Sequence, residues 1–215
     1  MMTKNLEKAS FAAAAAGVAT GLTNAAENKA LDETIAKIKD KDDKVRSEAW
    51  QTAATCGAPA VKPLASLLAD PEIEVTRAAK RALLKIVRQA GRPGAGQEKK
   101  AVVVELIPLL AKSTPTEARR ELVWMLSELG GDESVGPVAA LLSETEMRED
   151  ARMVLQRIPG QKSIAALKSA LASAPEDFKA NLAVSLRQRG VKVEGYPSQK
   201  LVPTKSTNVK PAKVS

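Results

Sequence analysis

The sequence contains no histidine and a single cysteine, Cys56, in its 215 residues. Without histidine, the chain cannot build a Ser-His-Asp or Cys-His catalytic site, a histidine-ligated zinc site or a histidine acid–base pair. One cysteine permits neither an internal disulfide nor a cysteine-rich metal site. Because Cys56 lies on the apolar side of an expected helix, we expect it to be a buried small residue rather than a reactive thiol.

Aromatic residues are also scarce, with two Trp, two Phe and one Tyr in the whole chain. A core must therefore be packed from Ala, Leu, Val and Ile, which suits closely spaced helices. No run of Val, Ile, Thr or Tyr alternates with polar residues between turns, so strands are not expected. The apolar run from Phe11 to Leu22 is too short for a membrane span and is interrupted by Gly17 and Gly21. The composition therefore favours an all-α protein.

Five segments share a pattern in which apolar residues recur every three or four positions, as on one face of a helix. A second apolar helix is expected after the first four of these segments. Self-similarity at about 30 residues predicts stacked helical hairpins, each of which buries its apolar face against its neighbours. The longest step contains a Gly-rich insertion, residues 91–100, which we expect to be a mobile loop. The patterns start at Val45, Val75, Ala118, Met147 and Phe178, with steps of 30, 43, 29 and 31 residues.

Proline and glycine mark the expected helix boundaries. Pro63 and Pro137 are expected in the first turns of second helices, where a missing N–H breaks no helical hydrogen bond. Pro108 lies deeper in its pattern and should kink that helix or delay its start. The first helices of four repeats are expected to end in left-handed turns at Gly57, Gly130, Gly160 and Gly190.

The repeated unit has a recognisable order: an acidic turn, Val-Arg or a similar pair, an Ala-rich helix, a glycine, and an apolar helix with an early proline. This order resembles the HEAT repeat, in the short form of about 30 residues found in the HEAT-like family first named from phycobilisome lyases. The resemblance covers residues 41–190 and implies a right-handed α-solenoid of about four to five helical hairpins. It implies little about activity, because fold and function are separable. The residues that carry it are Asp70, Pro71, Val75, Ala78 and Ala79, and Val45, Arg46, Ala49, Gly57, Val61, Pro63 and Leu64.

The chain divides into three parts. Residues 1–28 resemble a bacterial secretory signal with cleavage near Ala25, or else form an Ala-rich disordered or helical arm. Residues 29–190 are expected to form the solenoid, and its first helix spans Leu31 to Lys39 as a polar cap. Residues 191–215 are rich in Lys, Pro, Ser and Thr and are expected to be a disordered basic tail. These features leave an exported and a cytoplasmic location both open.

Charge is distributed unevenly along the chain. The net charge is +8, of which +4 lies in residues 191–215, whereas residues 117–160 have a net charge of −4. A long phosphate backbone laid along the whole solenoid would therefore be repelled in its middle. This distribution favours local contacts over a uniform nucleic-acid surface.

Sequence motifs give no support for catalysis. The Gly-rich insertion has the glycine gap of a P-loop between Gly91 and Gly96, but Gln97 and Glu98 follow where the motif needs Lys and Ser or Thr. A dinucleotide-binding pattern also fails there, because no third glycine follows. Adjacent carboxylates such as Glu149 and Asp150 point apart on a helix and lie at a helix start. We therefore expect no enzyme activity, no cofactor and no metal site.

Three kinds of side chain are candidates for contact with a partner. Four cations at helical spacing in the second repeat form either a solvated outer face or an anion-binding surface. The two tryptophans occupy nearly equivalent places in the first and third repeats, where they either anchor a partner or pack between helices. A lysine and a serine lie on the first of the second helices, which should line a concave surface. The candidate partner-binding residues are Lys62, Ser66, Trp50, Trp124, Arg77, Arg81, Lys85 and Arg88.

Three functions remain open from the sequence. The first is a non-enzymatic scaffold or adaptor that binds another protein on the concave surface of the solenoid. The second is nucleic-acid binding with an architecture like that of the HEAT-like DNA glycosylases, although those enzymes use aromatic residues, which are rare here. The third is a chromophore lyase or isomerase, which only the family resemblance suggests. The sequence does not identify the partner.

Overall fold

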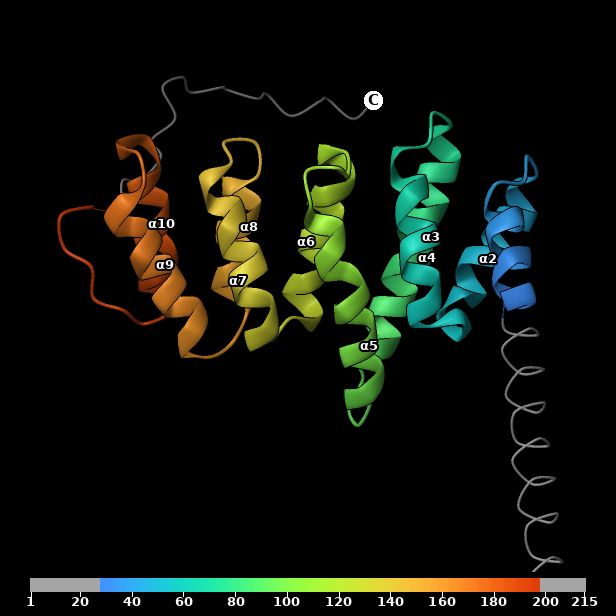
Figure 1. Ribbon diagram of the computed structural model, residues 1–215, viewed down its shortest axis with the longest axis horizontal. Coiled ribbons are helices and arrows are strands. Elements are labelled where there is room, and N and C mark those ends of the chain that lie inside the picture. Colours follow the sequence, from blue (N-terminus) through green and yellow to red (C-terminus); the bar gives the residue numbers. More distant parts are fainter. Residues whose placement is uncertain (1–27, 198–215) are drawn as a thin grey trace, which may run out of the picture.

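The computed structural model describes residues 28–197, which form helices joined by short turns, with no strand in that range. Helical units stack side by side in a single row (Figure 1), so the described chain is an α-solenoid. After a helix over residues 28–38, the chain alternates between two layers. The first helices, which form one layer, are α2 (Asp43–Thr52), α4 (Ile73–Ala90), α6 (Thr116–Leu129), α8 (Arg148–Arg157) and α10 (Glu176–Gln188). The second helices, which form the other, are α3 (Val61–Ser66), α5 (Gly96–Leu106), α7 (Asp132–Ala140) and α9 (Gln161–Ser173).

Short 3₁₀ helices extend several of these helices by one turn. They occur where the backbone tightens before a change of direction. Each second helix packs against the first helix that follows it, so α3 lies along α4 rather than along α2. The α3–α4, α7–α8 and α9–α10 pairs are therefore offset by half a unit from the repeat seen in the sequence, whereas α5 contacts both α4 and α6. The 3₁₀ helices are η1 (Ala53–Cys56), η2 (Ala58–Ala60), η3 (Leu67–Ala69), η4 (Ile107–Leu110) and η5 (Leu141–Ser143).

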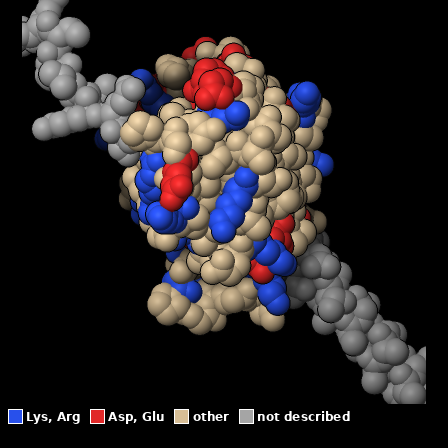
Figure 2. All heavy atoms as spheres, turned by 90° about the vertical axis from the view of Figure 1, so that its left-hand side faces the viewer, with Lys and Arg blue, Asp and Glu red and all other residues tan. Residues whose placement is uncertain are grey.

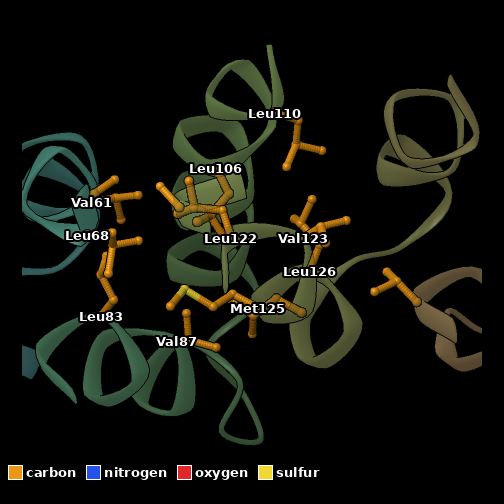
Figure 3. Close-up of a cluster of buried hydrophobic side chains, with 14 of the residues drawn as sticks. Val61, Leu68, Leu83, Val87, Leu106, Leu110, Leu122, Val123, Met125 and Leu126 are labelled. Atoms are coloured by element: carbon orange, nitrogen blue, oxygen red, sulfur yellow. The ribbon is translucent and has the colours of Figure 1, made fainter. Parts of the chain in front are cut away.

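The core is continuous along the row, because side chains from successive helices interdigitate between the two layers. Leucine, valine and alanine fill nearly all of it, as the scarcity of aromatics predicted. Phe178, in the last unit, is the one aromatic side chain of the described residues that is almost completely buried. Figure 3 shows the central part of this core, where α3, η3, α4, α5, η4 and α6 contribute Val61, Leu68, Leu83, Val87, Leu106, Leu110, Leu122, Val123, Met125 and Leu126.

In the first three repeats, the residue that follows the start of the pattern holds the turn that precedes the first helix. Arg46 donates hydrogen bonds to the carbonyls of Asp40 and Lys41 at 2.7 and 2.8 Å. Thr76 occupies the corresponding place in the next repeat, and its hydroxyl donates to the carbonyl of Asp70 at 3.1 Å. These bonds satisfy carbonyls that the end of a helix leaves without a partner. The Val-Arg pair of the sequence pattern is thus a structural element of the repeat.

Arg119 has the same role in the third repeat and is the only charged side chain among the described residues that is fully buried. Its Nε donates to the carbonyl of Leu110 at 2.9 Å, and its terminal nitrogen bonds to the Glu144 carboxylate at 2.8 Å. The side chain of Arg119 is 5% exposed and that of Glu144 is 21% exposed. Arg119 therefore ties the end of η4, the start of α6 and the turn after η5 together.

Three of the four expected left-handed turns are present, and one is not. Gly57, Gly160 and Gly190 have φ values of 58°, 96° and 77°. Gly130 has an extended backbone with φ of −60°, so the prediction of a left-handed turn there is wrong. Glycine is still required at this position, because a Cβ would lie 2.5 Å from the carbonyl oxygen of Leu126.

The prolines also depart from expectation in two places. Pro63 lies in the first turn of α3, as predicted. Pro137 lies inside α7 rather than in its first turn, because α7 already begins at Asp132. Pro108 neither kinks α5 nor delays its start, since α5 ends at Leu106 and the chain continues as the 3₁₀ helix η4.

The second half of the Gly-rich insertion is helical, which corrects the expectation of a loop over residues 91–100. α5 begins at Gly96, so the connection from α4 spans only residues 91–95. Both terminal nitrogens of Arg92 bond to the Glu98 carboxylate, at 2.5 and 2.6 Å, and clamp the connection onto the first turn of α5. In Figure 1 this end of the α4–α5 pair extends below the rest of the row.

The chain beyond α10 is partly ordered, which corrects the expectation of disorder from residue 191 onward. Val191 and Val193 pack against the core of the last unit. Arg187 donates hydrogen bonds to the carbonyls of Val193 and Tyr196, which holds residues 191–197 against α10. Figure 2 shows the molecule from this end of the row, where scattered charged side chains lie among mostly uncharged ones. The expected signal or Ala-rich arm over residues 1–27, and the remainder of the basic tail, lie outside the described residues.

Candidate protein-binding surface

The layer of first helices uses its polar side chains to join each helix to the next. Lys80 of α4 bonds to Glu121 of α6 at 2.6 Å, and Arg148 of α8 bonds to Asp177 of α10 at 2.5 Å. Arg152 of α8 donates to the hydroxyl of Ser185 on α10 at 2.6 Å. These lateral contacts bridge neighbouring units. The first-helix layer is therefore largely engaged in holding the solenoid together.

Both tryptophans take part in this layer. Trp50 of α2 is half-buried, and the Arg81 and Lys85 head groups of α4 lie 5.4 and 5.7 Å from its ring centroid. These distances are those of a cation–π interaction. Trp124 of α6 is half-buried too, and its indole N–H donates to a carboxylate oxygen of Asp150 on α8 at 3.1 Å. Each tryptophan thus contacts the next first helix, as expected for packing between helices.

The four cations of α4 do not form a free anion-binding row. Two of them cover the Trp50 ring, and Arg77 forms an ion pair with Glu74 at 2.6 Å. Arg88 is exposed and makes no ion pair among the described residues. A single exposed arginine is a weak site for a phosphate backbone. This geometry favours the solvated or packed alternative for the stripe.

The second helices present open grooves between neighbours. One groove of about 770 Å³ lies between the start of α3 and α5. Another, of about 540 Å³, lies between α7 and α9 and extends to α10. We call the surface formed by α3, α5, α7 and α9 the second-helix face. Each groove lies between two neighbouring second helices, which belong to the same layer.

The structure places the two candidate residues of α3 on this face. Lys62 is exposed and lines the α3–α5 groove. Ser66 is exposed one turn further along α3, where its hydroxyl donates to the carbonyl of Pro63 at 2.7 Å. Ser66 does not line either groove. Of the eight candidate residues, Lys62 is therefore the one that the structure places in a groove.

Sequence reasoning missed the contribution of α5 to this groove. Lys100, Val104 and Glu105 line it opposite Lys62. The expectation of a loop up to residue 100 hid the helical spacing of Lys100 and Val104, which lie four residues apart. Val104 also lies within the apolar run AVVVEL, where sequence alone does not separate the one outward valine from its buried neighbours.

Arg92 and Glu98, at the start of α5, shift each other's pKa values. The hydrogen bond from Arg92 holds the pKa of the Glu98 carboxyl below its ordinary value of 4.5. The same bond raises the pKa of the Arg92 guanidinium. Both groups are at the surface, and Glu98 also lines a small cavity of about 230 Å³ whose other lining residues are all uncharged. Their shifts reflect a structural ion pair.

The described residues contain neither a metal-site cluster nor a membrane-spanning helix. Within residues 28–197, no cluster of three or more Cys, Asp or Glu side chains has the geometry of a metal site. No helix in that range is both long and apolar enough to cross a bilayer. Cys56 is half-buried rather than fully buried, and its thiol lies 3.6 Å from the hydroxyl of Thr34.

Comparisons with known proteins add a few similar structures. No protein-family model matches the sequence, and no curated protein matches it. The chain is similar to an engineered protein solved by a structural genomics consortium, at 22% identity and a TM-score of 0.39, over 82% of this chain and 87% of that one. It is also similar to a designed armadillo repeat protein in complex with the peptide (KR)4, at 19% identity and a TM-score of 0.40, over 77% and 84% of the two chains. At these scores the comparisons assign no ligand, and the HEAT-like subfamily stays a prediction. The chain's own helices and their packing identify it as a helical repeat protein.

Proposed function

We propose that the protein is a non-enzymatic scaffold that binds a segment of another protein on its second-helix face. One observation supports this proposal above the others: the two grooves described above lie between second helices, whereas the first helices use their charges and tryptophans to contact one another. A solenoid surface is formed before binding, so a partner needs to reorder little of it. Modest contacts along the grooves then suffice for specific binding.

The experiment compares captured partners between matched variants of the full chain. A tagged protein is purified from its native cells with nuclease treatment, and bound proteins are quantified by mass spectrometry. Lys62→Glu places a negative charge in the α3–α5 groove, and Ala140→Glu places one in the α7–α9 groove. Arg88→Glu places one on the exposed surface of α4 and serves as the control. We expect a stoichiometric protein to be lost from the groove variants and retained by Arg88→Glu, with helicity unchanged in all three.

Two results would contradict the proposal. Retention of the partner by both groove variants would remove the second-helix face as the binding surface. Complete loss of binding after nuclease treatment would instead support a nucleic-acid ligand, whose affinity should fall steeply with added salt.

A further inference from the structure

The two grooves of the second-helix face differ in chemistry. The α7–α9 groove is lined by neutral residues only, chiefly alanine and serine. The α3–α5 groove has two lysines, Lys62 and Lys100, together with one carboxylate, Glu105. Its remaining lining is Ala58, Pro59, Pro63, Gln97, Ala101 and Val104. The α3–α5 groove therefore combines apolar contact surface with an excess of positive charge.

The two lysines of this groove are exposed and are not engaged by the rest of the solenoid. Among the described residues, neither Lys62 nor Lys100 forms an ion pair. Cations of the first-helix layer such as Lys80 and Arg148 do, at 2.6 and 2.5 Å. The groove thus keeps two ammonium groups available to an external anion.

An exposed valine lies in the same groove. Val104 is 64% exposed and is the most exposed large hydrophobic residue of the described chain. The neighbouring Val102, Val103 and Leu106 are buried in the core, so the outward direction of Val104 follows from its place on α5. A single exposed valine is ordinary on a protein surface. Beside Ala101 and two prolines in a groove, it offers an apolar contact for a ligand side chain.

We propose that the α3–α5 groove binds an extended acidic peptide segment, which places an apolar side chain against Val104 and carboxylates beside Lys62 and Lys100. This assignment rests on the proposed scaffold function and adds the chemistry of the partner. Opposite charges across the groove steer the association and disfavour a basic peptide. The peptide residue that lies beside Glu105 should be uncharged, because the Glu105 carboxylate would repel a second carboxylate there.

A peptide fits this groove better than a nucleic acid does. No aromatic side chain lines the groove, so bases have nothing on which to stack. Glu105 lies beside the lysines and would repel a continuous row of phosphates. The next segment of the chain, residues 117–160, has a net charge of −4 and would oppose a longer strand. A short acidic and apolar segment avoids both penalties.

The test is selection from a displayed library of short random peptides on the immobilised full chain. Enriched peptides are then synthesised, and their affinities are measured by fluorescence anisotropy for matched variants. The groove variant is Lys62→Glu with Lys100→Glu, and its control is Arg88→Glu with Arg157→Glu, which changes the net charge equally at exposed first-helix positions. Val104→Ser is matched by Met153→Ser, an exposed apolar residue of α8.

We expect enrichment of Asp or Glu together with Leu, Ile, Val or Phe. The groove charge reversal should weaken binding of these peptides by at least about tenfold, because two attractions become repulsions, and the control should change it by less than about twofold. Val104→Ser should weaken binding by several-fold, with Met153→Ser close to wild type.

The opposing outcomes separate this inference from the scaffold proposal. Neutral or basic peptides that lose binding in the Ala140→Glu variant would contradict the acidic ligand and leave the second-helix face as the binding surface. Peptides that bind all groove variants equally would contradict both proposals. Failure to enrich any peptide would contradict the peptide assignment. So would a single-stranded DNA that binds as tightly as the enriched peptides and loses binding when Lys62 and Lys100 are reversed.

Discussion

Arg119 shows how a single buried charge holds three segments together. Replacing it with methionine keeps the unbranched aliphatic part of the side chain but removes the guanidinium, which leaves the Glu144 carboxylate and the Leu110 carbonyl without their partner. Breaking a buried ion pair from one side is costly, because the remaining charge stays partly desolvated. We expect Arg119→Met to lower the free energy of unfolding by about 2–4 kcal/mol, measured by urea denaturation.

The adjacent arginine provides the control. Arg120 is 48% exposed and pairs with Glu146 and Asp150 at 3.6 and 3.4 Å. Exposed pairs contribute little, so Arg120→Met should cost less than about 1 kcal/mol. Equal losses in the two variants would show that burial of Arg119 is not what gives its ion pair its importance.

Gly130 gives a second residue-scale prediction. A methyl group at this position would lie 2.5 Å from the Leu126 carbonyl oxygen and 3.0 Å from the Ser134 hydroxyl oxygen. The backbone must therefore shift, and we expect Gly130→Ala to lower the free energy of unfolding by about 1–3 kcal/mol. Gly96→Ala, where nothing lies within 4 Å of the added carbon, should leave thermal unfolding unchanged or slightly higher. A neutral Gly130→Ala would contradict the close approach.

Sequence reasoning located Gly130 but not its role, and it did not single out Arg119. It predicted that Gly130 is needed where a helix ends, yet the reason is the space beside a carbonyl rather than a left-handed turn. It gave no sign that Arg119 is buried and Arg120 exposed, because both fit the charged side of a helical pattern. The partner that buries Arg119 is Glu144, and it lies in a distant turn.

At the scale of the element, the start of α5 depends on the pair of Arg92 and Glu98. Their hydrogen bonds lower the pKa of the Glu98 carboxyl. A depressed folded-state pKa stabilises the structure above the unfolded value of 4.5, and that contribution is lost as pH falls through the folded-state pKa. We expect the Glu98 carboxyl to titrate below other exposed glutamates by NMR, and amide exchange at Gly96 to Lys99 to quicken as it protonates.

Arg92→Gln is the matched test of that cause. Without the guanidinium, the pKa of Glu98 should return towards 4.5, and the added pH dependence of the first turn of α5 should disappear. An unchanged titration of Glu98 in this variant would assign its shift to the helix terminus instead.

Helix periodicity predicted the elements well where apolar residues recur regularly. α4, α6, α8 and α10 all lie where the pattern placed them. The start of α5 was missed because three glycines occur between residues 91 and 96, which is typical of a loop. Its helix forms there because Glu98 favours a first turn and Arg92 clamps it, and neither effect is visible in hydrophobic periodicity.

At the scale of the whole molecule, residues 191–197 cover the C-terminal end of the row. Val191 and Val193 pack against the last unit, and Arg187 holds the backbone of residues 191–197. Ending the chain after Gly190 should therefore loosen α9 and α10. Because contacts in a solenoid join neighbours only, we expect faster amide exchange in these two helices and little change in α2 and α4. Uniform loosening along the row would contradict this local coupling.

The binding surface illustrates the limit of sequence reasoning at this scale. The repeat predicted stacked hairpins and a role for their second helices. The location of a groove depends on the spacing between α3 and α5, and that spacing follows from packing across several units. Lys62 was therefore predicted as a candidate, whereas Lys100 and Val104 became visible only when the helices were placed together.

The longer connection between α4 and α5 has a consequence for folding. Similar repeats can assemble out of order, since one unit offers its neighbours nearly the same apolar face as the next. The α4–α5 pair extends beyond the row and carries its own Arg92–Glu98 clamp, so no other unit can take its place without leaving that extension unmatched. We therefore expect this one irregular unit to keep the other units in their order along the row as the nearly periodic chain folds.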